Sequence, residues 1–195
     1  MKKFLNCLLL SFVGTLFAKE SPNISTCAAC HGSAGVSVNS MWPTIAGQHA
    51  RYIEKQLLEF KAGKTRPAEI MLPFVASLTA EEIKALAAYY SKQSRVQATA
   101  PSHRANERGK QLYHMGDRAL HIPACIACHG PTGIGNAHAG FPVVSGQHAD
   151  YLVAQLKLFK EGQRTNDLNS IMRDIASRMT VADMQAVSDY MEQLK

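Results

Sequence analysis

Two copies of one short cysteine motif constrain this chain more than any other feature of its sequence. Residues 27–32 read C-A-A-C-H-G, and residues 125–130 read C-I-A-C-H-G. A C-x-x-C-H motif is the attachment site of c-type haem. Two thiols one helical turn apart can each form a thioether with one vinyl group of a single haem, and the next residue then places its imidazole under the iron. The pattern therefore predicts two covalently bound haem c groups.

The motifs assign six residues to these haem groups. The expected attachment residues are Cys27, Cys30, Cys125 and Cys128, and the expected axial histidines are His31 and His129. A thioredoxin-like redox pair would need a βαβ context that the sequence lacks. A four-cysteine zinc site would not explain a histidine after each pair. Disulfides within the motifs would close loops too short to stabilise a fold.

The first 18 residues have the three parts of a secretory signal peptide. A basic start at 1–3 precedes an apolar stretch at 4–18, and a polar segment follows at 19–22. We expect cleavage near Ala18 and a mature chain in the periplasm. An uncleaved membrane anchor is the alternative, and it is disfavoured because the apolar stretch is shorter than the roughly 20 residues that span a bilayer.

Composition and charge exclude several other classes of protein. The chain has 195 residues, of which 46% are apolar and 18% charged, so it is too apolar to be disordered and long enough for one or two small domains. Without residues 1–18 it carries 19 Lys and Arg against 15 Asp and Glu. Because this excess is small and no basic run occurs, we expect no nucleic-acid partner.

The two motifs belong to a longer internal repeat. Cys27 recurs as Cys125 at an offset of 98, and the segment G-Q-H-A at 47–50 recurs at 146–149, at an offset of 99. Further residues match at this second offset, in the order Tyr52 with Tyr151, Gln56 with Gln155, Leu57 with Leu156, Phe60 with Phe159 and Gly63 with Gly162. The chain is therefore a tandem duplication.

The repeat divides the mature chain into two small domains. We expect the first at 19–95 and the second at 105–195, joined by a linker at 96–104 that contains Pro101. Each half has fewer than 100 residues, which is marginal for a core built of side chains alone. A covalently held haem would supply the missing apolar volume, so we expect each haem to be structural as well as functional.

The hydrophobic period within each half is that of a helix. Apolar residues recur at helical spacing over 52–60, Gly63 is placed to end that helix, and the pattern returns over 151–162. A second stripe predicts the final helix of the first half and is formed by Ile83, Leu86, Ala87 and Tyr90. Each final helix is expected to start with a capping box, formed by Thr79 with Glu82 and by Thr180 with Asp183. No long β-alternation occurs, so the expected fold class is all-α.

Several segments of both halves match a known family. Each half has its cysteine motif followed by a proline, a G-Q-H segment and a late methionine, and the second half adds further matches at 133–136, 139–142 and 164–167. In these features the chain resembles dihaem cytochromes c of the cytochrome c4 type, over essentially its whole mature length. The resemblance implies two class I cytochrome c domains packed face to face, each wrapped round one covalent haem, in a periplasmic electron carrier.

One difference from this family concerns the start of the first half. Similar domains open with a helix that packs on the last helix, and the sequence predicts one at 106–115 with Gly109, Leu112 and Tyr113 on one face. The first half has only residues 19–26 ahead of its cysteine motif. We therefore expect the first domain to be less stable alone and to depend on its neighbour.

The repeat also indicates which residue is the second axial ligand of each iron. Met and His are the usual second ligands, and only Met71 and Met172, at an offset of 101, are methionine in both halves. They follow His31 and His129 by 40 and 43 residues, far enough for the chain to pass round the ring. Met71 and Met172 are therefore the expected ligands, as the resemblance also implies, and a packing role is the alternative. The other methionines of the second half that align with apolar residues are expected in the core, and they are Met179, Met184 and Met191.

Two prolines and two histidines recur near the expected haem sites. In similar cytochromes the carbonyl of a proline accepts the second ring N–H of the haem-binding histidine, and the resemblance gives this role to Pro43 and Pro142, with an ordinary turn as the alternative. His49 and His148 lie only 18 and 19 residues past the haem-binding histidines, at the start of a helix. For them a surface position or a haem-propionate contact is expected rather than ligation.

Three classes of function fit a dihaem chain of this size. A soluble electron carrier needs both irons saturated by His and Met, which leaves no position for a substrate. A dihaem peroxidase needs one open iron and a substrate pocket, for which the sequence offers no extra domain or long loop. A cytochrome subunit that accepts electrons from a dehydrogenase differs from the carrier only in its partner. The sequence therefore favours a carrier that is not an enzyme, with the dehydrogenase subunit as the first alternative.

The expected partners are other redox proteins. The resemblance implies a membrane terminal oxidase as the electron acceptor, and a quinol-oxidising complex or a dehydrogenase as the donor. The sequence leaves open whether the mature chain is soluble or associates with the periphery of the membrane.

Overall fold

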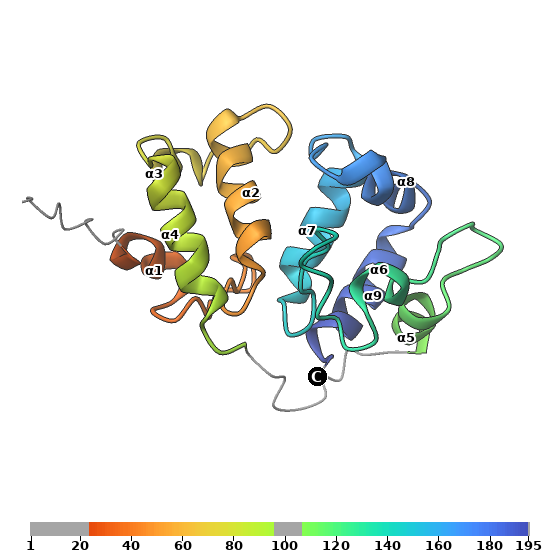
Figure 1. Cartoon of the computed structure of the whole chain (residues 1–195). Coiled ribbons are helices and arrows are strands. Elements are labelled where there is room, and N and C mark those ends of the chain that lie inside the picture. The colour runs from red at the N-terminus through yellow and green to blue at the C-terminus, as the bar shows by residue number, and fades with distance from the viewer. Residues whose placement is uncertain (1–23, 96–106, 195) are drawn as a thin grey trace, which may run out of the picture.

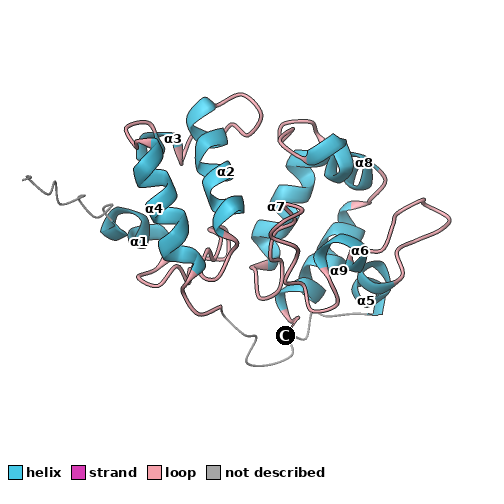
Figure 2. Cartoon of the chain, in the orientation of Figure 1, coloured by secondary structure: helices cyan, strands magenta, loops and turns pink. Residues whose placement is uncertain are grey.

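The regular structure of the chain is helical. The computed structural model describes residues 24–95 and 107–194, and within these ranges it contains helices and two isolated β-bridges but no strand (Figure 2). The all-α fold class is therefore confirmed. The expected signal peptide at 1–18 and the expected linker at 96–104 lie outside the described residues. No helix within the described ranges is long and apolar enough to cross a membrane.

The first half is built around a pair of packed helices. Its helices are α1 (Ile24–His31), α2 (Ala50–Ala62), α3 (Leu72–Val75) and α4 (Ala80–Ser91) (Figure 1). Helix α2 packs against α4, and α3 lies against α2. The buried cluster between α2 and α4 consists of Ile53, Leu86, Ala87 and Tyr90. The stripe that predicted the final helix is thus the face that α4 buries.

The second half repeats this pair and adds a helix before it. Its elements are α5 (Glu107–His114), α6 (Ile126–His129), α7 (Ala149–Lys160), the 3₁₀ turn η1 (Leu168–Ser170), α8 (Ile171–Ser177) and α9 (Val181–Glu192). Helix α9 packs against both α5 and α7, and α7 packs against α8. The core methionines predicted from the repeat are buried here, as Met179, Met184 and Met191.

Local sequence sets the helix ends. The hydroxyl of Thr79 accepts a hydrogen bond from the Glu82 backbone N–H, and the Glu82 carboxylate accepts one from the Thr79 N–H. Thr180 and Asp183 form the same pair at the start of α9, so both predicted capping boxes are confirmed. Gly63 ends α2 with φ of 63°, a left-handed conformation that glycine adopts without strain.

Helix α5 is the main difference between the halves. Gly109 lies so close to α9 that a Cβ there would stand 2.1 Å from the carbonyl oxygen of Ala186. Leu112 and Tyr113 are both fully buried. The helix predicted at 106–115 is therefore confirmed, together with its buried face. In the first half, the described chain begins with α1, which itself carries the cysteine motif.

The two halves lie side by side, with α2 and α7 facing each other (Figure 1). A backbone hydrogen bond of 2.7 Å, from the Thr165 N–H to the Thr65 carbonyl, joins the loops that follow these two helices. The interface is thus built from matching positions of the repeat.

Candidate haem sites and the interface between them

Short helices present the cysteines of each motif. Cys27 and Cys30 lie on α1, and Cys125 directly precedes α6, which contains Cys128. One helical turn separates the two thiols of each pair, and all four cysteines are half-buried and form no disulfide. Within the described residues, no cluster of three or more His, Cys, Asp or Glu could hold a metal ion. The arrangement fits thioether attachment and offers no support for a shared zinc site.

Each motif histidine is fixed by a proline carbonyl. Nδ1 of His31 lies 2.8 Å from the Pro43 carbonyl oxygen, and Nδ1 of His129 lies 3.0 Å from that of Pro142. Because a carbonyl can only accept, Nδ1 carries the hydrogen in both rings and Nε2 is left without one. Burial lowers the pKa of both imidazoles, and the proline carbonyls oppose this shift. Both rings are thus held neutral, with Nε2 available to bind iron.

Glycines shape the loops that bring these prolines to the histidines. The Gly35 carbonyl accepts hydrogen bonds from the backbone N–H groups of Ile45 and Ala46, and the Gly133 carbonyl does the same in the second half. Both glycines have a left-handed φ, of 80° and 70°. A side chain at Gly35 would also meet Tyr90. The same tight loop therefore returns the chain to each histidine.

The structure places the two repeated methionines at equivalent positions. Met71 is half-buried and directly precedes α3, and Met172 is half-buried as the second residue of α8. Met172 packs against the buried core of the second half. Each of these helices packs on the long helix that follows the histidine loop, α2 or α7. Both methionines thus lie at the start of a short helix that packs on the long helix of their half.

His49 and His148 hold the two halves together, a role that the sequence did not predict. Nε2 of His49 lies 2.8 Å from the carbonyl oxygen of Ile134, and Nε2 of His148 lies 2.9 Å from that of Ser37. Each ring therefore donates its Nε2–H to the backbone of the other half. Both side chains remain partly exposed, as expected, and each adds an interdomain hydrogen bond that leaves its Nε2 unable to ligate iron.

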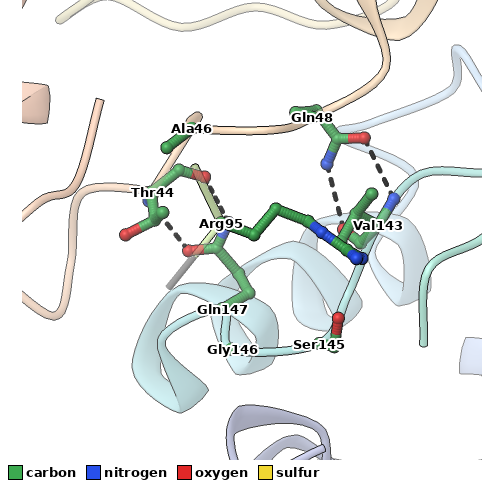
Figure 3. Close-up of a pocket in the computed structure, with 8 residues that line it drawn as sticks. All are labelled: Thr44, Ala46, Gln48, Arg95, Val143, Ser145, Gly146 and Gln147. Carbon is green, nitrogen blue, oxygen red and sulfur yellow. Dashed lines mark hydrogen bonds between the residues drawn. The ribbon is translucent and has the colours of Figure 1, made fainter. Parts of the chain in front are cut away.

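Two glutamines make matching contacts across the same interface (Figure 3). The Gln147 amide pairs with both backbone groups of Thr44, at 3.0 Å to its N–H and 2.8 Å to its carbonyl. The Gln48 amide pairs with both backbone groups of Val143, each at 3.0 Å. Thr44 and Val143 are themselves repeat partners at offset 99. The interface therefore has pseudo-twofold symmetry.

A cluster of arginines and tyrosines closes the interface near the carboxyl ends of α2 and α7. Arg66 donates to the Tyr151 hydroxyl at 2.8 Å, and Arg164 donates to the Tyr52 hydroxyl at 2.9 Å. Both arginines are buried, and each guanidinium stacks on a phenylalanine of its own half. The recurrence of polar residues at helix positions such as Gln56 and Gln155 is the sequence signal that could have revealed this interface.

Comparisons with known proteins agree with this geometry. The family "Cytochrome c" matches residues 15–93 and again residues 106–195. Cytochrome c4 of Thiocapsa roseopersicina is 42% identical over 183 residues, which are 93% of this chain and 94% of that protein. The chain belongs to the cytochrome c family, in its dihaem c4 group.

Other cytochromes of this kind support the same conclusion. The crystal structure of reduced recombinant cytochrome c4 from Pseudomonas stutzeri matches with a TM-score of 0.83 and 38% identity, covering 88% of this chain and 95% of that chain. The thiosulfate dehydrogenase electron acceptor of Thiomonas intermedia is 37% identical over 94% of this chain and 88% of that protein. The present cytochrome therefore carries two covalent haem c groups, one on each motif.

Proposed function

We propose that this cytochrome is a periplasmic dihaem electron carrier in which His31 and Met71 hold one iron, while His129 and Met172 hold the other. The observation that supports this most is the pair of histidine–proline hydrogen bonds, of 2.8 and 3.0 Å. They engage Nδ1 of each ring and fix the ring's orientation, so that Nε2 would be the atom that binds the iron. Pro43 and Pro142 are thus positioning residues for the two ligands.

The proposed ligands of each iron would suit electron transfer and leave no room for substrate chemistry. When bound, each haem supplies a one-electron Fe(III)/Fe(II) couple. His31 with Met71 and His129 with Met172 would hold the two irons, and methionine as a ligand would raise the reduction potential. Two saturated irons leave no position for a substrate, so we propose no enzymatic activity. The hydrogen bonds across the interface would keep the two haem domains in one orientation during the exchange of electrons.

The sequence of residues 1–18 supports export to the periplasm. Amino-terminal sequencing of the protein from a periplasmic extract should begin at Lys19 if cleavage follows Ala18. The domains at 19–95 and 105–195 would then both face the periplasm, where a terminal oxidase in the membrane is the proposed electron acceptor and a quinol-oxidising complex the proposed donor.

A second candidate is the electron-accepting partner of a dehydrogenase. It is favoured by the similarity over 94% of this chain to a thiosulfate dehydrogenase electron acceptor. The two candidates share the same haem chemistry and differ in the protein that delivers the electrons.

Stopped-flow measurements separate the two candidates. The reduced cytochrome is mixed with membranes that contain a terminal oxidase, and the oxidised cytochrome is mixed with thiosulfate dehydrogenase and thiosulfate. The carrier proposal predicts rapid, cyanide-sensitive oxidation by the membranes and slow reduction by the dehydrogenase. The opposite pair of rates would favour the dehydrogenase partner, and sustained turnover of hydrogen peroxide would contradict both.

A further inference from the structure

Tyr90 carries a buried hydroxyl that the protein does not pair. The residue lies on α4, is 2% exposed and belongs to the core of the first half. Its hydroxyl is fully buried and has no hydrogen-bond partner among the described residues. Burying a hydroxyl without a partner is costly, so a native core usually supplies an acceptor.

The polar group next to this hydroxyl is the sulfur of Cys27. Cys27 packs against the core cluster that contains Tyr90. Burial raises the pKa of the Tyr90 hydroxyl, and the neighbouring Cys27 sulfur raises it further. Burial likewise raises the pKa of the Cys27 thiol, and the hydroxyl beside it lowers that pKa. The two groups are thus close enough to interact.

Attachment of haem decides the direction of this interaction. A free thiol can donate or accept a hydrogen bond, but a thioether sulfur can only accept. Once Cys27 has formed its thioether, a hydrogen bond between the two groups could run only from the Tyr90 hydroxyl to the sulfur.

In the second half, the residues around the first cysteine of the motif make different contacts. The repeat partner of Tyr90 is Met191, which has no hydroxyl. A tyrosine hydroxyl does lie near Cys125, but it belongs to Tyr113 on α5 and donates to the Gly130 carbonyl at 2.6 Å. The Cys125 sulfur itself lies 3.7 Å from the carbonyl of Leu112. Within the part of the chain that the structure describes, the tyrosine hydroxyl near Cys27 is thus unpaired, whereas the one near Cys125 is already engaged.

We propose that Tyr90 donates a hydrogen bond to the Cys27 thioether sulfur, and that this bond raises the reduction potential of the first haem relative to the second. Hydrogen bonds to the groups that carry a redox centre are one of the means by which proteins set its potential. A donor at the sulfur would withdraw electron density from the porphyrin inductively, through the saturated carbon of the thioether link, and so would favour Fe(II). The inference rests on the haem attachment and ligation proposed above.

The test is a spectroelectrochemical titration of the full chain with Tyr90→Phe, a change that removes only one oxygen. The matched control is Tyr113→Phe, which removes the hydroxyl already committed to Gly130. Met71→Ala and Met172→Ala identify the component of each haem, because each should shift one of the two potentials. Tyr90→Phe should lower the potential of the first haem and leave the second unchanged, whereas Tyr113→Phe should leave the first potential in place.

Two outcomes would overturn the inference. One is an unchanged first potential in Tyr90→Phe, and the other is an equal shift of both potentials. If the protein keeps two haems and both Met–iron bands in that experiment, the proposed function stands even though the inference fails. If Tyr90→Phe does not retain haem, proton NMR of the reduced wild type decides instead. A slowly exchanging tyrosine hydroxyl proton close to the Cys27 thioether protons is expected, and its absence would refute the bond.

Discussion

The side-chain amide of Gln147 makes hydrogen bonds to both the backbone N–H and the backbone carbonyl of Thr44. A side chain of the second half thus pairs with the backbone of the first. Gln48 does the same to Val143 in the opposite direction. Both glutamine side chains are buried, so each unmade bond would leave a backbone group without a partner. The two halves are therefore expected to unfold together.

Replacing both glutamines should uncouple the halves. Each hydrogen bond is worth about 0.5–1.5 kcal/mol, so Gln48→Ala with Gln147→Ala removes several kcal/mol from the interface. When haem absorbance is followed during heating, we expect the wild type to unfold in one transition and the double variant in two. The matched control is Gln193→Ala, at the residue that follows α9, whose amide donates to the Asp189 backbone carbonyl of the same half. A single unshifted transition in the double variant would mean that the interface does not couple the domains.

The isolated halves should differ in stability. In the second half, α5 covers α9 and buries Leu112 and Tyr113 completely. In the first half, the described residues ahead of the cysteine motif contribute only the start of α1. Haem-loaded 105–195 should therefore melt at a higher temperature than haem-loaded 19–95. The reverse order would show that the opening helix is not what stabilises the second half.

Gly109→Ala should separate α5 from α9. The new Cβ would stand 2.1 Å from the Ala186 carbonyl oxygen, which is backbone and cannot rotate away. Overpacking of this kind costs about 1–3 kcal/mol, and it opposes a gain of up to about 1 kcal/mol from the better helix propensity of alanine. We expect a lower melting temperature of the second domain in calorimetry. Lys110→Ala, at an exposed neighbouring position, is the control and should not lower the melting temperature of the second domain.

Asp183 should make the second domain sensitive to acid. Burial alone would raise the pKa of its carboxyl, but hydrogen bonds from Thr180 and Arg108 outweigh burial and lower it. A lowered folded-state pKa means that the stabilisation is present above the unfolded value of about 4 and is lost as the pH falls through the folded value.

Asp183→Asn tests this acid dependence. We expect the free energy of unfolding to fall by about 1.5–3 kcal/mol at neutral pH, with the difference from wild type shrinking as the pH approaches 3 in urea titrations. Glu82→Gln, in the exposed capping box of α4, is the control and should have a smaller effect. A difference in unfolding free energy between Asp183→Asn and the wild type that stays constant from pH 7 to pH 3 would show that the charge of Asp183 is not involved.

The sequence predicts the elements of each half better than their assembly. The capping boxes, the buried stripe of α4 and the buried face of α5 each depend on residues a few positions apart, so periodicity alone reveals them. The interface depends on Gln48, Gln147, His49 and His148 reaching the backbone of the other half. A sequence pattern does not show which carbonyl an amide or imidazole will meet. The repeat showed that these residues recur in both halves, but it did not reveal their contacts.

The most direct test of the account is the binding of carbon monoxide to the reduced protein. If His31 with Met71 and His129 with Met172 fill the axial positions, the wild type should bind little carbon monoxide at neutral pH and keep its Met–iron absorption band. Met172→Ala should create one binding site per protein. The control Met179→Ala, a change at a side chain that is 3% exposed, should cost about 2–5 kcal/mol of stability and leave ligation intact. Stoichiometric carbon monoxide binding by the wild type, or loss of the Met–iron band in Met179→Ala but not in Met172→Ala, would contradict the proposed ligation.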